Sequence, residues 1–304
     1  MIVYALLGFT LLVACCSLLL LRKGMKQTGR YAWHKIAAAL ALGLFIYLYG
    51  TWLYLSVYTR YVFILAGIVA ILTGVRQKKA IVRPRFETGK AVANTLIALL
   101  CSALSLLYFT GTTGKPATLE LDFPLRHGNY IVLQGGKGLP TNLFHYGLRG
   151  AVYAMDIAQL NSWGNRADKV FSQRLEDYRI FGDTVFSPCS GRVKTVHTDN
   201  PDNIPPDRTR GPSNTNMVLI ETDSGYVFMA HFKHNSIFVN EGDVVTAGQA
   251  LGLVGNSGFS MEPHLHIQAH RKTKPGALWY TEPQVFLHFN GKGYLLFQTI
   301  RARP

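Results

Sequence analysis

Apolar residues are distributed along this chain in two different ways. Up to residue 110 they form four continuous runs, at 2–21, 36–55, 61–75 and 91–109. A run of about 20 apolar residues is long enough to cross a bilayer as a helix, which satisfies its own backbone hydrogen bonds in lipid. The third run reaches that length if it begins near Val57. The pattern predicts an α-helical transmembrane region of about four helices over residues 1–110, with the first run retained as a helix.

Beyond a short linker at residues 111–118, the pattern changes to short apolar stretches separated by Gly, Pro, Asn and Asp, as in "NMVLIETDSGYVFMAHF". This spacing predicts an all-β domain with an antiparallel sheet over residues 119–304. The stretch "TDSG" at 222–225 predicts a hairpin turn. Two segments interrupt the pattern. Residues 165–182 have room for one short helix, and residues 198–216 form a long Pro-rich loop.

Basic residues between the apolar runs predict the topology. The loop between runs two and three holds only Arg60. Because basic loops stay in the cytoplasm, we expect a multi-pass protein of the cytoplasmic (inner) membrane, with the N-terminus and the β domain on the extracytoplasmic (periplasmic) side. The two loops placed inside hold Arg22, Lys23, Lys26, Arg30 and Lys35, and Arg76, Lys78, Lys79, Arg83, Arg85 and Lys90.

The charge distribution also argues against a nucleic-acid partner. Residues 1–110 contain 12 Lys and Arg and a single acid, Glu87, so they hold +11 of the formal net charge of +14. The basicity therefore follows the membrane topology and does not mark a nucleic-acid surface. The expected partner of this region is the lipid bilayer. Cys189 is the only cysteine of the β domain, so no disulfide can form within it and its stability must come from its core.

The stretch "FSMEPHLHIQAH" places His264 and His266 one residue apart. On a strand, these two side chains point to the same face and Leu265 to the other. Two aligned imidazoles can bind a metal, although a short HxH motif also fits two hydrogen-bonded surface histidines. Asp156 lies in the apolar stretch "VYAMDIAQ". A buried carboxylate needs either hydrogen-bond partners or a metal, and the motif alone does not choose between them.

The order of the motifs resembles a known family. An early His is followed by Asp in "YAMD", then by "GDTVFSPCSGRV", "YVFMAHF", "GDVVTAGQALGLVGNSG" and "EPHLHI". This order, from about Leu119 to Phe286, is similar to that of the lysostaphin-type zinc metallopeptidases, which are peptidoglycan endopeptidases. The resemblance implies that zinc is held by His145, Asp156 and His266. It also implies that His231 and His264 are catalytic residues beside the metal.

One spacing departs from the common family pattern. The first ligand His usually lies four positions before the Asp, and Val152 occupies that position here. A subgroup of the family looks similar to this chain, with an Asn and a His after a Gly-Gly turn, as in "LQGGKGLPTNLFH". His145 is therefore favoured as the first ligand, and His127 is the alternative. We expect "GLRG" to turn the chain and "AVYAM" to return as a strand, which would form a hairpin.

The resemblance implies a membrane-bound zinc metalloendopeptidase that hydrolyses peptide bonds in peptidoglycan stem peptides or cross-links. The alternative is a catalytically silent module that binds peptidoglycan or a partner and regulates other wall hydrolases. A third reading takes "VNEGDVVTAGQALGLVG" as part of a lipoyl- or biotin-carrier-like hammerhead. That reading requires a modifiable Lys nearby, and none is present. The remaining histidines, His197, His234, His270 and His288, are expected to be solvated.

Overall fold

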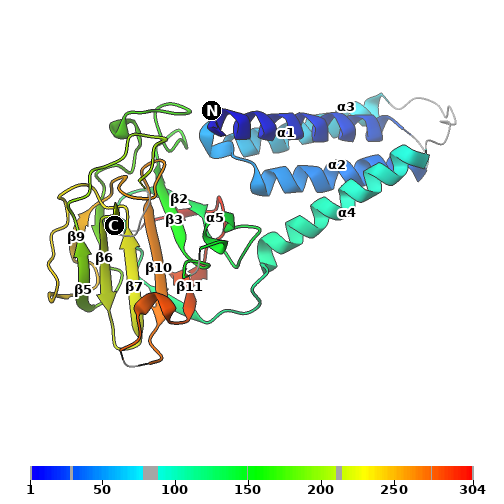
Figure 1. The fold of residues 1–304 in the computed structure, drawn as a ribbon. Coiled ribbons are helices and arrows are strands. Elements are labelled where there is room, and N and C mark those ends of the chain that lie inside the picture. Colours follow the sequence, from blue (N-terminus) through cyan, green and yellow to red (C-terminus); the bar gives the residue numbers. More distant parts are fainter. Residues whose placement is uncertain are drawn as a thin grey trace. The chain divides into compact units, whose positions relative to one another are not determined.

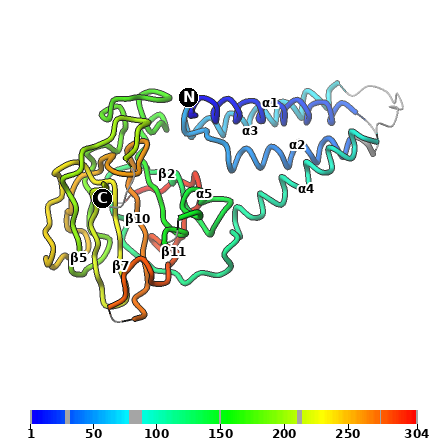
Figure 2. The backbone as a smooth tube through the Cα atoms, in the orientation of Figure 1, coloured from blue at the N-terminus to red at the C-terminus, as the bar shows by residue number. Residues whose placement is uncertain are grey.

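The chain folds into two compact units, Met1–Phe109 and Thr110–Pro304 (Figures 1 and 2). They are seen in a computed structural model, which describes residues 2–27, 30–77, 88–148, 150–209, 214–274 and 276–302. Five charged residues of the third loop between apolar runs, Lys78, Lys79, Arg83, Arg85 and Glu87, lie outside the described residues.

The first unit consists of the helices α1 (Ile2–Lys26), α2 (Arg30–Tyr49), α3 (Thr59–Arg76) and α4 (Thr88–Thr110). Each contains a segment that is long and apolar enough to cross a membrane. Large apolar side chains such as Leu12, Leu65 and Leu100 are more than 60% exposed, as lipid-facing residues would be. The predicted four-helix region is confirmed.

The second apolar run is split in two. The helix α2 ends at Tyr49, and a 3₁₀ turn, η1 (Trp52–Tyr54), follows after Gly50. The indole Nε1 of Trp52 donates to the carbonyl oxygen of Ile46 at 2.9 Å, and the amide of Gly50 donates to the same oxygen at 2.9 Å. These bonds satisfy a carbonyl that the end of the helix would otherwise leave unpaired.

The second unit is a twisted sheet with antiparallel pairing between its described strands, except for one parallel pair, β1 with β11. The strand order is β13-β2-β3-β10-β7-β6-β5-β8, with β11 joining β10 to β1 and β12. A separate two-stranded sheet pairs β4 with β9. The predicted antiparallel β domain is thus confirmed. The strand bounds are β1 Thr118–Leu121, β2 Asn129–Gln134, β3 Met155–Leu160, β4 Thr184–Phe186, β5 Gly191–His197, β6 Met217–Glu221, β7 Gly225–Ala230, β8 Val244–Val245, β9 Ala250–Leu253, β10 Leu265–Arg271, β11 Gln284–Phe289, β12 Lys292–Gly293 and β13 Thr299–Arg301.

Helical turns in this unit are short. They are α5 (Leu143–Tyr146) and the 3₁₀ turns η2 (Leu175–Asp177) and η4 (Trp279–Thr281). The expected short helix within 165–182 is the single 3₁₀ turn η2. The expected hairpin at 222–225 joins β6 to β7, and the amide of Thr222 donates to the carbonyl oxygen of Gly225 at 2.8 Å.

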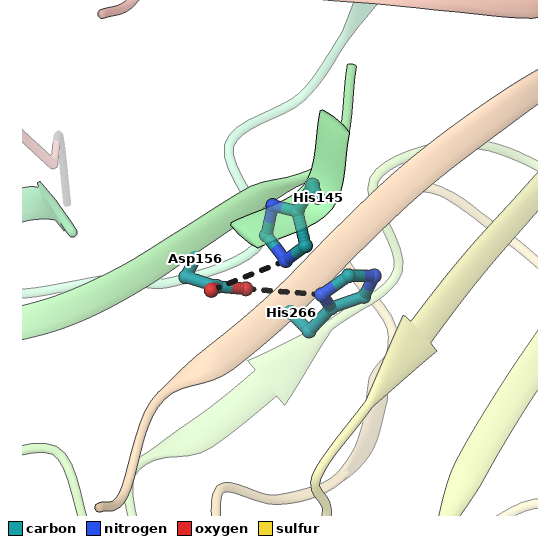
Figure 3. A group of neighbouring side chains, drawn as sticks. All are labelled: His145, Asp156 and His266. Carbon is teal, nitrogen blue, oxygen red and sulfur yellow. Dashed lines mark hydrogen bonds and ion pairs between the residues drawn. The ribbon is translucent and has the colours of Figure 1, made fainter. Parts of the chain in front are cut away.

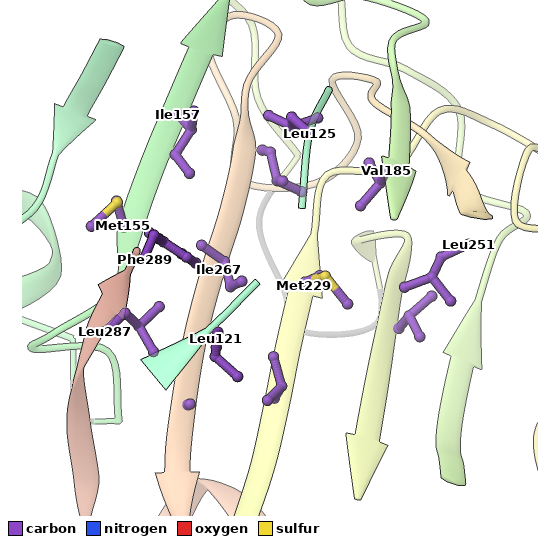
Figure 4. Close-up of a cluster of buried hydrophobic side chains, with 14 of the residues drawn as sticks. Leu121, Leu125, Met155, Ile157, Val185, Met229, Leu251, Ile267, Leu287 and Phe289 are labelled. Carbon is purple, nitrogen blue, oxygen red and sulfur yellow. The ribbon is translucent and has the colours of Figure 1, made fainter. Parts of the chain in front are cut away.

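The core lies against one face of the central strands (Figure 4). Strand β10 contributes Leu265, Ile267 and Ala269 to it, all at most 1% exposed. Alternation along the strand then turns His266, Gln268 and His270 to the opposite face. Because β10 is hydrogen bonded to β3 on one side and β7 on the other, this row of polar side chains is fixed at the centre of the sheet.

Candidate metal centre

Three elements bring the candidate ligands together (Figure 3). His266 on β10 pairs in register with Asp156 on β3 and with Ala230 on β7, so His231 follows immediately after the pairing position. The one-turn helix α5 carries His145 above the Asp156 carboxylate. All three candidate ligands are buried, and each comes from a different segment.

The ligand atoms of these residues converge. His145 Nε2 lies 3.3 Å from Asp156 Oδ2, and His266 Nδ1 lies 3.0 Å from Asp156 Oδ1. One ligand atom from each residue lies within 4.8 Å of the other two. Atoms that surround a zinc ion at about 2.0–2.2 Å have separations of this size. Within the part of the chain that the structure describes, this is the one group of histidines, cysteines and acids close enough to hold a metal ion.

Hydrogen bonds assign the tautomer of His145. The side chain of Asn142, fully buried, donates through Nδ2 to the carbonyl oxygens of Val152 at 2.9 Å and Ala154 at 2.8 Å. Its Oδ1 is thereby turned to His145 Nδ1, at 2.8 Å. An amide oxygen can only accept, so Nδ1 of His145 carries the proton. The lone pair on Nε2 then points at the Asp156 carboxylate.

A second chain of hydrogen bonds assigns the tautomer of His266. Gln268 Nε2 donates to the carbonyl oxygen of Gly150 at 2.8 Å, which turns its Oε1 to His266 Nε2 at 2.9 Å. The proton of His266 is therefore on Nε2, and the lone pair of Nδ1 faces Asp156. Gln268 Nε2 also donates to His270 Nε2 at 3.0 Å, while His270 Nδ1 donates to the carbonyl oxygen of Glu282 at 2.9 Å. His266, Gln268 and His270 thus form a polar relay along one face of β10.

These assignments test whether the site suits a metal ion. Two imidazole nitrogens and a carboxylate converge here, and such an arrangement is repulsive unless protons on the nitrogens or a metal cation lie between them. Two neutral imidazoles and one carboxylate form a donor set that zinc accepts, and three protein ligands leave the fourth position of a tetrahedral site open. The residues present therefore fit a catalytic type of zinc site.

The electrostatics of Asp156 follow from its neighbours. Burial alone would raise the pKa of this carboxyl group, but the adjacent imidazoles of His145 and His264 outweigh it and hold the pKa well below its usual value. Asp156 is therefore an anion at neutral pH. A buried anion that is matched to nitrogen donors is the expected state of a metal-binding carboxylate.

His231 and His264 lie side by side next to the ligand group, with ring centroids 4.6 Å apart. Nδ1 of His231 donates to the carbonyl oxygen of Ser257 at 2.8 Å, and Nδ1 of His264 donates to that of Glu262 at 2.8 Å. Both rings therefore turn Nε2 away from the backbone. His264 Nε2 lies 3.5 Å from Asp156 Oδ1.

The surroundings of the two rings separate their pKa values. Burial lowers the pKa of His231 well below its usual value, and the nearby His264 and His266 lower it further. Burial also acts to lower the pKa of His264, but the Asp156 carboxylate outweighs that effect and the net shift is upward. His231 is thus a neutral base, and His264 holds a proton more readily. A neutral imidazole beside a more basic one provides a proton acceptor and a hydrogen-bond donor in the same site.

Several buried polar residues that support the site were not singled out in the sequence. Arg166, 2% exposed, binds Glu262 through two bonds of 2.8 and 2.7 Å, and Glu262 in turn holds His264 through its carbonyl oxygen. Gln268 supports His266, and Asn142 supports His145. The sequence held a signal for two of these residues. Gln268 lies two positions after His266 and therefore on the same face of the strand, and Asn142 lies three positions before His145.

The structure separates the two alternatives for the first ligand position. His145 lies against Asp156, whereas His127 is exposed, has a φ of 57° and lies in the turn before β2. The expected hairpin around "GLRG" is wrong. Strand β3 begins only at Met155. Before it, the amide of Ala151 donates to the carbonyl oxygen of Leu148 at 3.1 Å, and the amide of Ala154 donates to that of Ala151 at 2.9 Å, as in turns and not in a strand. The turn of α5, and not a returning strand, places His145.

The expectation that His270 is solvated is also wrong, since this side chain is 0% exposed. The edge of its ring meets the Trp279 indole, with centroids 5.2 Å apart. His234 is exposed, as expected, whereas His197 and His288 are half-buried.

Comparison with known proteins agrees with the motifs. Residues 176–277 match the family model of peptidase family M23. The matched segment contains His231, His264 and His266. It begins after His145 and Asp156, whose placement is known from the geometry above. No curated protein matches the chain.

Solved structures that are similar to part of this chain include two peptidases and the catalytic domain of an M23 protein. Lysostaphin from Staphylococcus simulans is 20% identical, with 50% of this chain and 47% of that chain covered and a TM-score of 0.29. A zinc-containing peptidase from Vibrio cholerae is 17% identical, with 54% and 40% covered and a TM-score of 0.33. A mutant catalytic domain of the prophage-encoded M23 protein EnpA from Enterococcus faecalis is 21% identical, with 54% and 94% covered and a TM-score of 0.32. This chain thus spans less than half the length of the first two.

Proposed function

We propose that this protein is a membrane-bound zinc metalloendopeptidase that hydrolyses peptide bonds of peptidoglycan stem peptides or cross-links. Residues 1–110 anchor it in the cytoplasmic membrane, and residues 119–304 form an extracytoplasmic peptidase domain that follows a linker at 111–118. The match of residues 176–277 to peptidase family M23 supports the reaction class and the wall substrate. The observation that carries the proposal is the convergence of two imidazole lone pairs on the Asp156 carboxylate.

His145, Asp156 and His266 would hold the zinc ion through Nε2, a carboxylate oxygen and Nδ1. When bound, zinc polarises the scissile carbonyl and lowers the pKa of a coordinated water. His231, kept neutral by burial, is suited to accept the proton of the attacking water. His264, whose pKa is raised, is suited to donate a hydrogen bond to the carbonyl oxygen as negative charge develops there.

The second candidate is a wall-binding module without activity. A silent module is expected to lack at least one of the ligand or catalytic residues. All five residues are present here and lie close together. Buried imidazoles with fixed tautomers are expensive to retain for binding alone, because each buried polar group needs a partner. The arrangement therefore favours the enzyme.

The test uses the full chain purified in detergent, loaded with zinc and incubated with cross-linked wall fragments. Metal content is measured by mass spectrometry, and released fragments are identified by their masses. We expect about one zinc per chain. Asp156→Ala should lose zinc and product together, whereas His264→Ala should keep zinc and lose product, because its contribution is made in the transition state. If the zinc-loaded wild type binds fragments but releases none, the silent module is correct.

A further inference from the structure

An exposed apolar surface surrounds the inward-facing His145. Within ten residues, five large apolar or aromatic side chains are between 41% and 60% exposed. Single exposed apolar residues are ordinary, but five on one segment of ten residues indicate an interaction surface. We call this surface the α5 patch, and its members are Leu139, Leu143, Phe144, Tyr146 and Leu148.

The inward position of His145 keeps the side chains of the α5 patch exposed. Asn142, fully buried, fixes the start of α5 and the ring of His145. A single helical turn with His145 pointing inward must direct its neighbours Phe144 and Tyr146 outward. The apolar residues therefore cannot turn into the core without moving His145 away from Asp156.

A short stretch of chain links the α5 patch to the last residue of α4. Helix α4 ends at Thr110, and the amides of Thr112 and Thr113 donate to the carbonyl oxygen of Lys137 at 2.9 and 3.3 Å. The amide of Leu139 donates to the hydroxyl of Thr112 at 3.1 Å. Only Gly111 separates Thr110, the last residue of α4, from Thr112, so few residues of chain lie between the end of α4 and the beginning of the patch.

The composition of this segment suits a lipid surface. From Gly135 to Ala154 the sequence contains no Asp or Glu, and Lys137 is its first charged residue. Exposed Leu, Phe and Tyr side chains next to a basic residue are the usual composition of a surface that lies in the headgroup region of a bilayer. An acidic residue would have opposed contact with anionic lipid.

We propose that the α5 patch inserts into the headgroup region of the bilayer that α4 spans and holds the metal centre at the membrane surface. The proposal rests on the membrane anchoring in the proposed function, and it adds that the site cleaves peptides presented next to lipid. Docking would also restrict the motion of α5, and with it the position of the His145 ring.

Nitroxide accessibility of the full chain in phosphatidylethanolamine–phosphatidylglycerol nanodiscs tests the proposal. The label is attached by Phe144→Cys in a chain whose native cysteines are replaced by alanine. Phe238→Cys is the matched control, since Phe238 is 56% exposed against 59% for Phe144 and precedes β8, far from β2 and β3 in the strand order. Leu100→Cys on α4 reports the membrane span itself. The replaced residues are Cys15, Cys16, Cys101 and Cys189.

We expect the ratio of oxygen collisions to nickel-chelate collisions at Phe144 to be at least roughly threefold higher than at Phe238, as for a group in the lipid interface. Equal ratios at the two sites would overturn the proposal. Leu143→Cys repeats the test if labelling Phe144 removes bound zinc. A label that becomes inaccessible to the nickel chelate only when wall peptides are added would show that the α5 patch contacts the substrate, and this result also overturns lipid docking. A water-accessible Leu100 label would instead contradict membrane anchoring, so the two failures are distinguishable.

Discussion

Replacing Gln268 with leucine should weaken zinc binding although this side chain is not itself one of the three candidate ligands. Gln268 makes three bonds: its oxygen accepts from His266 Nε2, and its nitrogen donates to Gly150 O and to His270 Nε2. Leucine has a similar volume and makes none of them. Without the acceptor, His266 is free to carry its proton on Nδ1, and in that tautomer it cannot bind a metal through Nδ1.

The size of the effect follows from the two roles of the side chain. Removing a partner of a ligating imidazole typically lowers metal affinity about 10- to 100-fold, which is about 1.4–2.7 kcal/mol. Leaving Gly150 O and His270 Nε2 buried without a donor should also lower the free energy of unfolding of the metal-free protein, by about 1–3 kcal/mol for each group. Gln268→Glu restores the acceptor for His266 but removes the donor. It should therefore regain most of the zinc affinity while remaining less stable than the wild type.

Zinc affinity is measured by competition with a chromogenic chelator, and stability by thermal unfolding of the metal-free chain in detergent. The matched control is Gln159→Leu, because Gln159 is 7% exposed and donates to the Tyr130 hydroxyl at 3.2 Å, away from the ligands. It should lower stability and leave zinc affinity unchanged. The reasoning is refuted if Gln268→Leu binds zinc as tightly as the wild type, or if both leucine variants weaken zinc binding equally.

Three further predictions concern the ligand choice, the pH dependence and the topology. His145→Ala should lower zinc affinity at least about tenfold, while His127→Ala leaves it nearly unchanged. Zinc affinity is measured by chelator competition, and a larger loss in His127→Ala than in His145→Ala would contradict the prediction. Burial lowers the pKa of His270, so below about pH 6.5 the unfolded state takes up a proton that the folded state resists. The free energy of unfolding should then fall by up to about 1.4 kcal/mol per pH unit, and thermal unfolding of His270→Gln between pH 7 and 5 should show a shallower fall. A reporter enzyme that is active only outside the cytoplasm, fused after Pro304, should be active, and a stable but silent fusion would contradict the topology.

Much of the fold could be predicted because its signals are local. The four apolar runs specify four helices through hydropathy alone, and "TDSG" specifies the β6–β7 hairpin through turn chemistry. The HxH motif predicted by simple alternation that His266 and His264 face the same side. Both rings do lie next to Asp156, although His264 comes immediately before β10 and not within it. These features depend on residues that are neighbours in the sequence.

The path from His145 to Asp156 could not be predicted in the same way. Its turns depend on the Asn142 side chain, which bonds to carbonyl groups 10 and 12 positions further on. No local propensity encodes such a contact, and the apolar stretch "AVYAM" suggested a strand instead.

The prediction for His270 failed for a related reason. A histidine near the end of a strand is usually solvated, but β10 is a central strand whose polar face is covered by Trp279 and the following residues. Burial imposed by a distant segment overrides the local expectation.

The parallel pairing of β1 with β11 has a mechanical consequence. Under the proposed function, the domain is pulled between a cross-linked wall and a membrane anchor, and the tension enters the domain through the linker. It meets the Thr112 and Thr113 bonds to Lys137 first, and then β1, which pairs with β11 over four residue positions, from Thr118 opposite Phe286 to Leu121 opposite Phe289. A pull along a strand loads the evenly spaced bonds of a parallel pair together and does not open them one at a time. The first strand of the domain therefore acts as a shear clamp between the anchor and the sheet that holds the metal ligands.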